Sequence, residues 1–200
     1  LGVAQMEEAR NHSLLCFELD AELRKLCLEC KKNFPVIKEN TERALRKIRL
    51  HKEIADQIVR GQAAALPDFP DGDVIETILM ACDKFHKSIV LLSLTCLQKL
   101  IQRGVLRDEA AAIVINLMRE QAANGDEIVQ LRVLQTVMAT PPRLTLLNYG
   151  VAEQLMQLLF ALHTSPSASV HHTAEAGLSA LAEKMADRAA LASERQASAD

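Results

Sequence analysis

Glycine, proline and aromatic residues are scarce in this sequence. Its 200 residues include 7 Gly, 6 Pro and no Trp, and aromatic residues make up 3% of the chain. Because β-sandwiches and barrels need frequent Gly and Pro turns between β-branched strands, this composition excludes them. It also argues against glycine-rich phosphate loops and aromatic surfaces that stack nucleic-acid bases. No apolar run reaches the ~18 residues that a membrane-spanning helix needs.

Leucine and alanine are abundant instead, with 30 and 28 copies, and 49% of the residues are apolar. Apolar residues recur with the 3.6-residue period of amphipathic helices, which predicts an all-α fold. We expect about eight helices, at 13–33, 35–60, 73–85, 87–103, 107–123, 126–140, 148–163 and 166–187. We also expect a flexible N-terminal extension at 1–12, one helical domain at 13–188 and a disordered tail at 189–200.

Similar apolar blocks recur in successive helix pairs. Leu97, Leu134 and Leu178 occupy equivalent places at spacings of 37 and 44 residues. Repeats of about 40 residues with two helices each are typical of armadillo and HEAT proteins, whose antiparallel pairs stack side by side. A compact bundle without repeats is the alternative. The repeat predicts that nine side chains are buried: Leu79, Leu97, Leu100, Leu117, Leu134, Val137, Leu158, Leu178 and Leu181.

Two clusters resemble chemical sites. Cys27 and Cys30 form a Cys-x-x-Cys pair, but a structural zinc site needs a second ligand pair at a similar spacing, and the sequence offers none. The five cysteines are scattered and odd in number, which indicates a reducing compartment and thiols packed in the core. Metal or redox function is the alternative.

The second cluster consists of His163, His171, His172 and Glu175. His171 and Glu175 could share a helix face, yet Ser165-Pro166 separates His163 from the others in sequence. We therefore interpret these histidines as solvent-exposed. The sequence predicts no catalytic residue, no metal site and no cofactor, so we expect a protein that is not an enzyme.

Positive charge is concentrated between Arg24 and Lys52, where ten basic residues face only three acidic ones in a chain whose net charge is −3. A solvated helix face is one interpretation. The other is a surface for anionic lipid or for an acidic protein partner. Nucleic acid is disfavoured because no aromatic residues alternate with the charges. The candidate residues are Lys31, Lys32, Phe34, Pro35, Lys38, Arg46, Lys47 and Arg49.

Four blocks of the chain resemble a known family: residues 23–39 (LRKLCLECKKNFPVIKE), 80–82, 94–100 and 130–137. They are similar to the dimerisation and cyclophilin-binding domain of the monensin-sensitivity family. These proteins are non-catalytic relatives of the large Sec7 Arf exchange factors. The resemblance covers about residues 14–187 and implies an armadillo-like fold.

The resemblance also implies a function. We expect a non-catalytic scaffold that forms a homodimer and binds an Arf-like small GTPase or companion trafficking scaffold proteins. It would be cytoplasmic and peripheral on trans-Golgi network and endosome membranes, with contact to anionic lipid and no nucleic-acid partner. The alternative is the regulatory N-terminal domain of a true large Arf exchange factor whose catalytic module lies elsewhere. An enzyme built on the Cys-x-x-Cys pair or the histidines, and a nucleic-acid-binding solenoid, are the remaining hypotheses.

Overall fold

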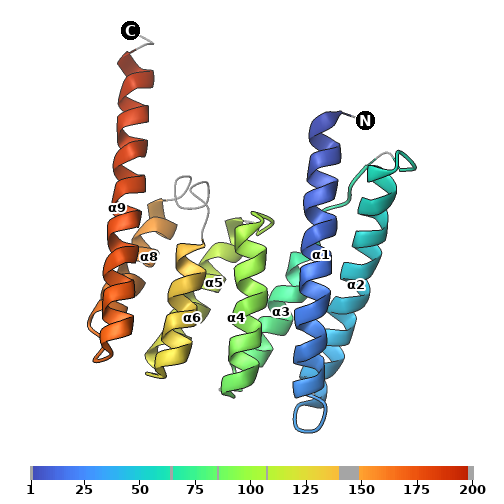
Figure 1. The fold of residues 1–200 in the computed structure, drawn as a ribbon, viewed down its shortest axis with the longest axis horizontal. Helices are drawn as coiled ribbons and strands as arrows, with labels where there is room; N and C mark the ends of the chain where they lie inside the picture. Colours follow the sequence, from blue (N-terminus) through green and yellow to red (C-terminus); the bar gives the residue numbers. More distant parts are fainter. Residues whose placement is uncertain (1, 64, 85, 107, 140–148, 198–200) are drawn as a thin grey trace. The chain divides into compact units, whose positions relative to one another are not determined.

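A computed structural model describes residues 2–63, 65–84, 86–106, 108–139 and 149–197 (Figure 1). Over these residues the chain forms eight α-helices and no β-strand, which confirms the predicted all-α class. The chain divides into two compact units, residues 1–107 and 108–200. None of the described helices is long and apolar enough to span a membrane.

The first unit contains α1 (Val3–Glu29), α2 (Pro35–Val59), α3 (Asp71–Cys82) and α4 (Lys87–Gln102). Helix α1 packs against α2 and α4, and α3 packs against the same two helices. Each helix therefore has two helical neighbours, and the four buried faces meet in one core. A stripe of four leucines on α1 lies there, with Leu15, Leu19, Leu23 and Leu26 fully buried.

The second unit contains α5 (Asp108–Ala123), α6 (Glu127–Met138), α8 (Tyr149–His163) and α9 (Ala168–Ala197). Helices α5 and α9 each pack against α6 and α8. Helix α9 lies close to α8 at Gly177, where an added Cβ would lie 2.9 Å from a methyl group of Leu159. Within each unit, successive helices thus pair and stack, as the stacked-helix prediction requires.

Seven of the nine leucine and valine side chains predicted to be buried are buried. The exceptions are Leu79 and Leu178, which are half-buried. In α3 the neighbouring Ile78 and Cys82 are almost fully buried, so Leu79 lies on the flank of the apolar stripe. Repeat spacing identifies the buried face of a helix, whereas the angle at which the next helix crosses it decides which residue is central.

Several helix boundaries differ from the predicted ones. Helix α1 begins at Val3 instead of Ser13, because Ala9 and His12 are buried in the first unit. Helix α9 continues to Ala197 instead of ending near Asp187. Helix α3 begins at Asp71 instead of Asp73 and ends at Cys82 instead of residue 85. The boundaries predicted at 107, 140 and 148 lie outside the described residues.

The end of α4 and the start of α6 lie within one residue of the predicted boundaries, and a capping residue is found at each. Gly104 follows α4 with φ of 66°, in the left-handed region that glycine adopts without strain. Asp126 precedes α6, and its carboxylate accepts hydrogen bonds from the backbone N–H groups of Ile128 and Val129 at 3.0 and 3.1 Å. These bonds satisfy two donors that have no partner within the helix.

We expect Asp126→Ala to lower the free energy of unfolding by about 0.5–2 kcal/mol, because it removes this N-cap. Urea denaturation followed by circular dichroism measures the change. The control is Glu120→Ala, which truncates an exposed side chain within α5. Equal stabilities of the two variants would contradict a capping role.

Candidate interaction surfaces

The eight residues proposed from sequence as a contact site lie around the α1–α2 corner and along α2. We call them the basic surface. Lys31 and Lys32 lie in the turn after α1, and Phe34 is the N-cap of α2. Pro35 is the first residue of α2, where its missing N–H costs no hydrogen bond. The remaining four, Lys38, Arg46, Lys47 and Arg49, project from α2.

Neighbouring helices neutralise much of this positive charge. The ammonium of Lys47 lies 2.7 Å from Asp73 of α3, and the Arg49 guanidinium lies 2.6 Å from Asp20 of α1. Lys38 pairs within α2 with Glu42, at 3.5 Å. The acidic partners of Lys47 and Arg49 lie outside residues 24–52, over which the charges were counted. That count therefore could not indicate this pairing.

Three cations of the basic surface remain: Lys31, Lys32 and Arg46. All three are exposed, and within the described residues none makes an ion pair. Phe34 is half-buried, and its ring packs edge-on against His86 with centroids 6.0 Å apart. Phe34 therefore fastens the α1–α2 corner to the start of α4, while the three cations stay available to a partner.

A second exposed feature runs along α1. Leu14, Phe17 and Leu28 are exposed by 47%, 66% and 71%, on the side of the helix opposite the buried leucine stripe. These three residues were not among the predicted contact residues. The signal for the second face was present, because Leu14, Phe17, Ala21 and Leu28 follow spacings of three, four and seven residues.

An open groove of about 360 Å³ borders this apolar face. Leu14 and Phe17 line it from α1, and Lys52, Asp56 and Val59 line it from α2. Arg10 also lines the groove, and its other polar groups pair with one another, since the Asp56 carboxylate accepts hydrogen bonds from Ser13 at 2.5 Å and from Lys52 at 2.6 Å. The groove thus enlarges the apolar face of α1.

The cysteines behave as core residues. Cys30 is fully buried and Cys27 is half-buried at the end of α1. Burial raises the pKa of the Cys30 thiol to about 11, and it also raises the pKa of Cys27. A redox or nucleophilic cysteine requires a lowered thiol pKa. Burial likewise raises the pKa values of the three remaining thiols, at Cys16, Cys82 and Cys96, to about 12.

The structure brings the histidine cluster together more closely than the sequence indicated. The rings of His163 and His171 pack with centroids 4.0 Å apart, and His171 Nδ1 donates a hydrogen bond to the His163 carbonyl at 2.6 Å. Ligand atoms of His171, His172 and Glu175 lie within 4.8 Å of one another. However, His172 and Glu175 are exposed, and the positive end of the α9 dipole disfavours a cation there.

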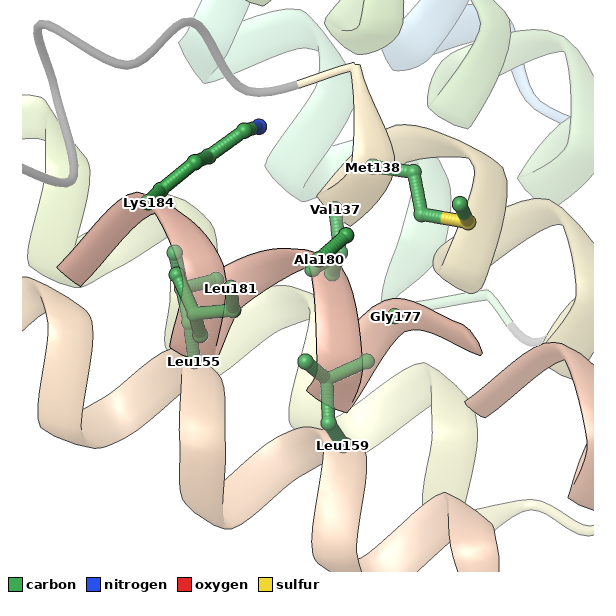
Figure 2. Close-up of a pocket in the computed structure, with 8 residues that line it drawn as sticks. All are labelled: Val137, Met138, Leu155, Leu159, Gly177, Ala180, Leu181 and Lys184. Carbon is green, nitrogen blue, oxygen red and sulfur yellow. The ribbon is translucent and has the colours of Figure 1, made fainter. Parts of the chain in front are cut away.

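The second unit contains a small pocket between α6, α8 and α9, of about 40 Å³ (Figure 2). Leu155, Leu159 and Leu181 surround it, and Lys184 lies at its edge. Pockets for small molecules span several hundred Å³. This one is therefore too small for such a ligand and is a gap in the packing of the three helices.

Comparison with known proteins gives the family. A sequence model described as "Mon2/Sec7/BIG1-like, dimerisation and cyclophilin-binding domain" matches residues 10–193. The human protein MON2 homolog is 30% identical over 158 residues, which cover 79% of this chain and 9% of that protein. The Xenopus laevis homolog is 29% identical over 164 residues, with the same two coverages. The Drosophila melanogaster homolog is 24% identical over 170 residues, covering 85% of this chain and 10% of the relative.

This chain spans about a tenth of the length of these relatives. No solved structure matches it. The family match extends across both compact units, from the first turns of α1 to the last turns of α9. The chain therefore belongs to the Mon2/Sec7/BIG1-like family of dimerisation and cyclophilin-binding domains.

Proposed function

We propose that this chain is a non-catalytic scaffold domain in membrane trafficking between the Golgi and endosomes. It associates with itself and binds an Arf-like small GTPase or companion scaffold proteins. It acts on the cytoplasmic side of trans-Golgi network and endosome membranes, with peripheral contact to anionic lipid. Membership of a family named for dimerisation and for Sec7 relatives supports this proposal.

The observation that carries the binding role is the exposed charge left on the basic surface. Lys31, Lys32 and Arg46 keep no ion pair in the described structure, although seven other cations between residues 24 and 52 have one. Arg46 lies eleven residues beyond Pro35, about 16 Å along α2. The three positive charges are therefore spread along the surface and are not concentrated at one point.

Anionic targets suit this arrangement. A lysine or arginine close to an anionic membrane contributes about 1 kcal/mol of attraction. Acidic patches on a protein partner would use the same cations, with dependence on ionic strength in both cases. Lys38, Lys47 and Arg49 contribute less, because their charges are partly neutralised by Glu42, Asp73 and Asp20.

We expect the triple variant Lys31→Glu, Lys32→Glu, Arg46→Glu to weaken binding to anionic vesicles and to an Arf-like GTPase by at least about tenfold. Vesicle flotation and GTPase pull-down at two ionic strengths measure this, and the melting temperature should stay unchanged. These positions are chosen because reversing Lys47 or Arg49 would place a carboxylate against Asp73 or Asp20 and destabilise the fold.

The matched control reverses three other cations, Lys99, Arg132 and Lys184, which changes the net charge equally on other surfaces. Equal loss of binding in both triple variants would indicate a general charge effect. Unchanged binding of the basic-surface variant in both assays would leave only the solvated-helix interpretation of these residues.

A further inference from the structure

Helix α1 carries a continuous exposed seam opposite its buried face. Its positions alternate by four and three residues along nearly the whole helix, and every one of them is exposed. We call the set the α1 seam: Val3, Glu7, Arg10, Leu14, Phe17, Ala21, Arg24 and Leu28. The buried residues lie on the other side, so the two faces use different residues of one helix.

Alternating spacings of four and three residues are the pattern by which two helices pack along their length. The α1 seam keeps this pattern through 26 of the 27 residues of α1, which correspond to about 39 Å of helix. Contacts with α2 and α4 use other sides of the helix. The seam is therefore an additional packing surface with no partner in the described part of the chain.

The order of residues along the seam makes it complementary to a second copy in the antiparallel orientation. With a two-fold axis between Leu14 and Phe17, Leu14 of each copy lies opposite Phe17 of the other copy. Glu7 then lies opposite Arg24, so two opposite-charge pairs form. At the ends Val3 meets Leu28, and Arg10 meets the small Ala21.

A parallel arrangement would instead place identical residues opposite each other. Glu7 would face Glu7, and Arg10 and Arg24 would each face their own copies. Like charges at such short separation destabilise a helix pair. Charge therefore selects the antiparallel pair, which has the isologous symmetry of most protein dimers.

We propose that the α1 seam is the interface through which two copies of this domain associate, as an antiparallel α1–α1 pair about a two-fold axis. This inference rests on the self-association in the proposed function and assigns the surface that performs it. The groove beside Leu14 and Phe17 extends the interface toward Val59 of α2, so each Phe17 reaches an apolar surface wider than one helix.

The charges near the seam favour a second copy over an anionic membrane. Glu7 lies in the seam, and Glu8, Glu18 and Asp20 lie on the same helix. Carboxylates near the headgroups of anionic lipid would be repelled, whereas across the two-fold axis Glu7 lies opposite Arg24. Arg24 already contacts Asp20 at 2.5 Å, and its guanidinium has enough donors to bind a second carboxylate.

Phe17→Glu tests the centre of the seam. Sedimentation of the whole chain at about 1 to 100 µM should show a dimer for the unmodified protein and a dissociation constant at least about 30-fold higher for the variant, as expected for a central aromatic contact. The melting temperature of the dissociated variant should match that of the unmodified chain diluted to monomer, because Phe17 is exposed in one copy.

The matched control is Phe160→Glu, which makes the same substitution at an exposed phenylalanine of α8 and should leave the dimer intact. An unmodified chain that stays monomeric at all these concentrations would overturn self-association and the seam together. A dimer that Phe17→Glu leaves unchanged would overturn the seam alone.

A charge exchange tests the antiparallel orientation. Glu7→Arg and Arg24→Glu should each weaken the dimer, because each places like charges opposite one another across the two-fold axis. Arg24→Glu also loses the exposed ion pair with Asp20, so the melting temperature of each variant as a monomer is compared with that of the unmodified chain. The double variant restores both opposite-charge pairs and should recover an affinity within about threefold of the unmodified dimer. A double variant no tighter than either single variant would overturn the antiparallel pairing.

Discussion

Truncating Leu134 to alanine is expected to lower the free energy of unfolding by about 2–5 kcal/mol. Leu134 has no exposed surface, and it lies in α6, which packs against α5 and α9. Alanine would remove apolar contact area and leave a cavity that rigid neighbouring helices cannot fill. Urea denaturation followed by circular dichroism measures the change as a lower midpoint with an unchanged slope.

The control on the same helix is Ile128→Ala. Ile128 lies in the first turn of α6 with its side chain largely exposed, so its truncation should change stability by less than about 0.5 kcal/mol. A Leu134→Ala variant as stable as the control would contradict a core position. It would also remove the main support for equating Leu134 with Leu97 in the repeat.

The sequence was sufficient to predict the fold class because helical periodicity depends on local spacing alone. Leu97 and Leu134 recur at the same place in successive pairs, and both are fully buried. Leu178 recurs as well but is half-buried, since its exposure depends on how α9 lies against α6 and α8. Local pattern identifies an apolar face, and tertiary packing decides how deeply each residue of that face is buried.

The candidate surfaces were less predictable because they depend on residues far apart in sequence. Lys47 and Asp73 are 26 positions apart, and only the packing of α2 against α3 makes them an ion pair. The charge count of a segment therefore overstated the free charge of the basic surface. The α1 seam could have been identified from its spacing, but a helix with apolar residues on two sides shows no single clear stripe.

The buried histidine pair was not predicted at all. His12 of α1 and His51 of α2 form a hydrogen bond of 2.9 Å between His12 Nδ1 and His51 Nε2. The ring of Phe69, from the loop before α3, packs edge-on against both, with centroids 5.4 and 5.1 Å away. The hydrogen bond joins α1 to α2, although the two histidines are 39 residues apart in sequence. Phe69 adds the loop before α3 to the same contact.

The pKa of His51 is lowered from 6.5 to about 4, first by burial and second by the adjacent His12 imidazole. Burial also lowers the pKa of His12, against an opposing effect of the Glu8 carboxylate. When both rings are neutral, the N–H of one ring can donate a hydrogen bond to the bare nitrogen of the other. If both rings were protonated, two N–H donors would face each other without an acceptor.

We therefore expect the first unit to lose stability as the pH falls from about 6.5 to 4. Because the folded-state pKa of His51 is below its unfolded value, the unfolded chain binds more protons in this range, and the contribution is complete only above pH 6.5. A shift of this size corresponds to about 3 kcal/mol in total, of which about 2 kcal/mol should be lost between pH 7 and pH 5.

Denaturation at pH 7, 6 and 5 measures this loss, and His51→Gln should make the unfolding free energy less dependent on pH because glutamine does not titrate. The control is Leu134→Ala, which lowers stability by a comparable amount in the second unit and keeps both histidines, so it should retain the full pH dependence. If His51→Gln and Leu134→Ala lose equal stability between pH 7 and pH 5, other groups cause the pH dependence. If His51→Gln alone resists acid, the buried pair makes the α1–α2 contact sensitive to protonation.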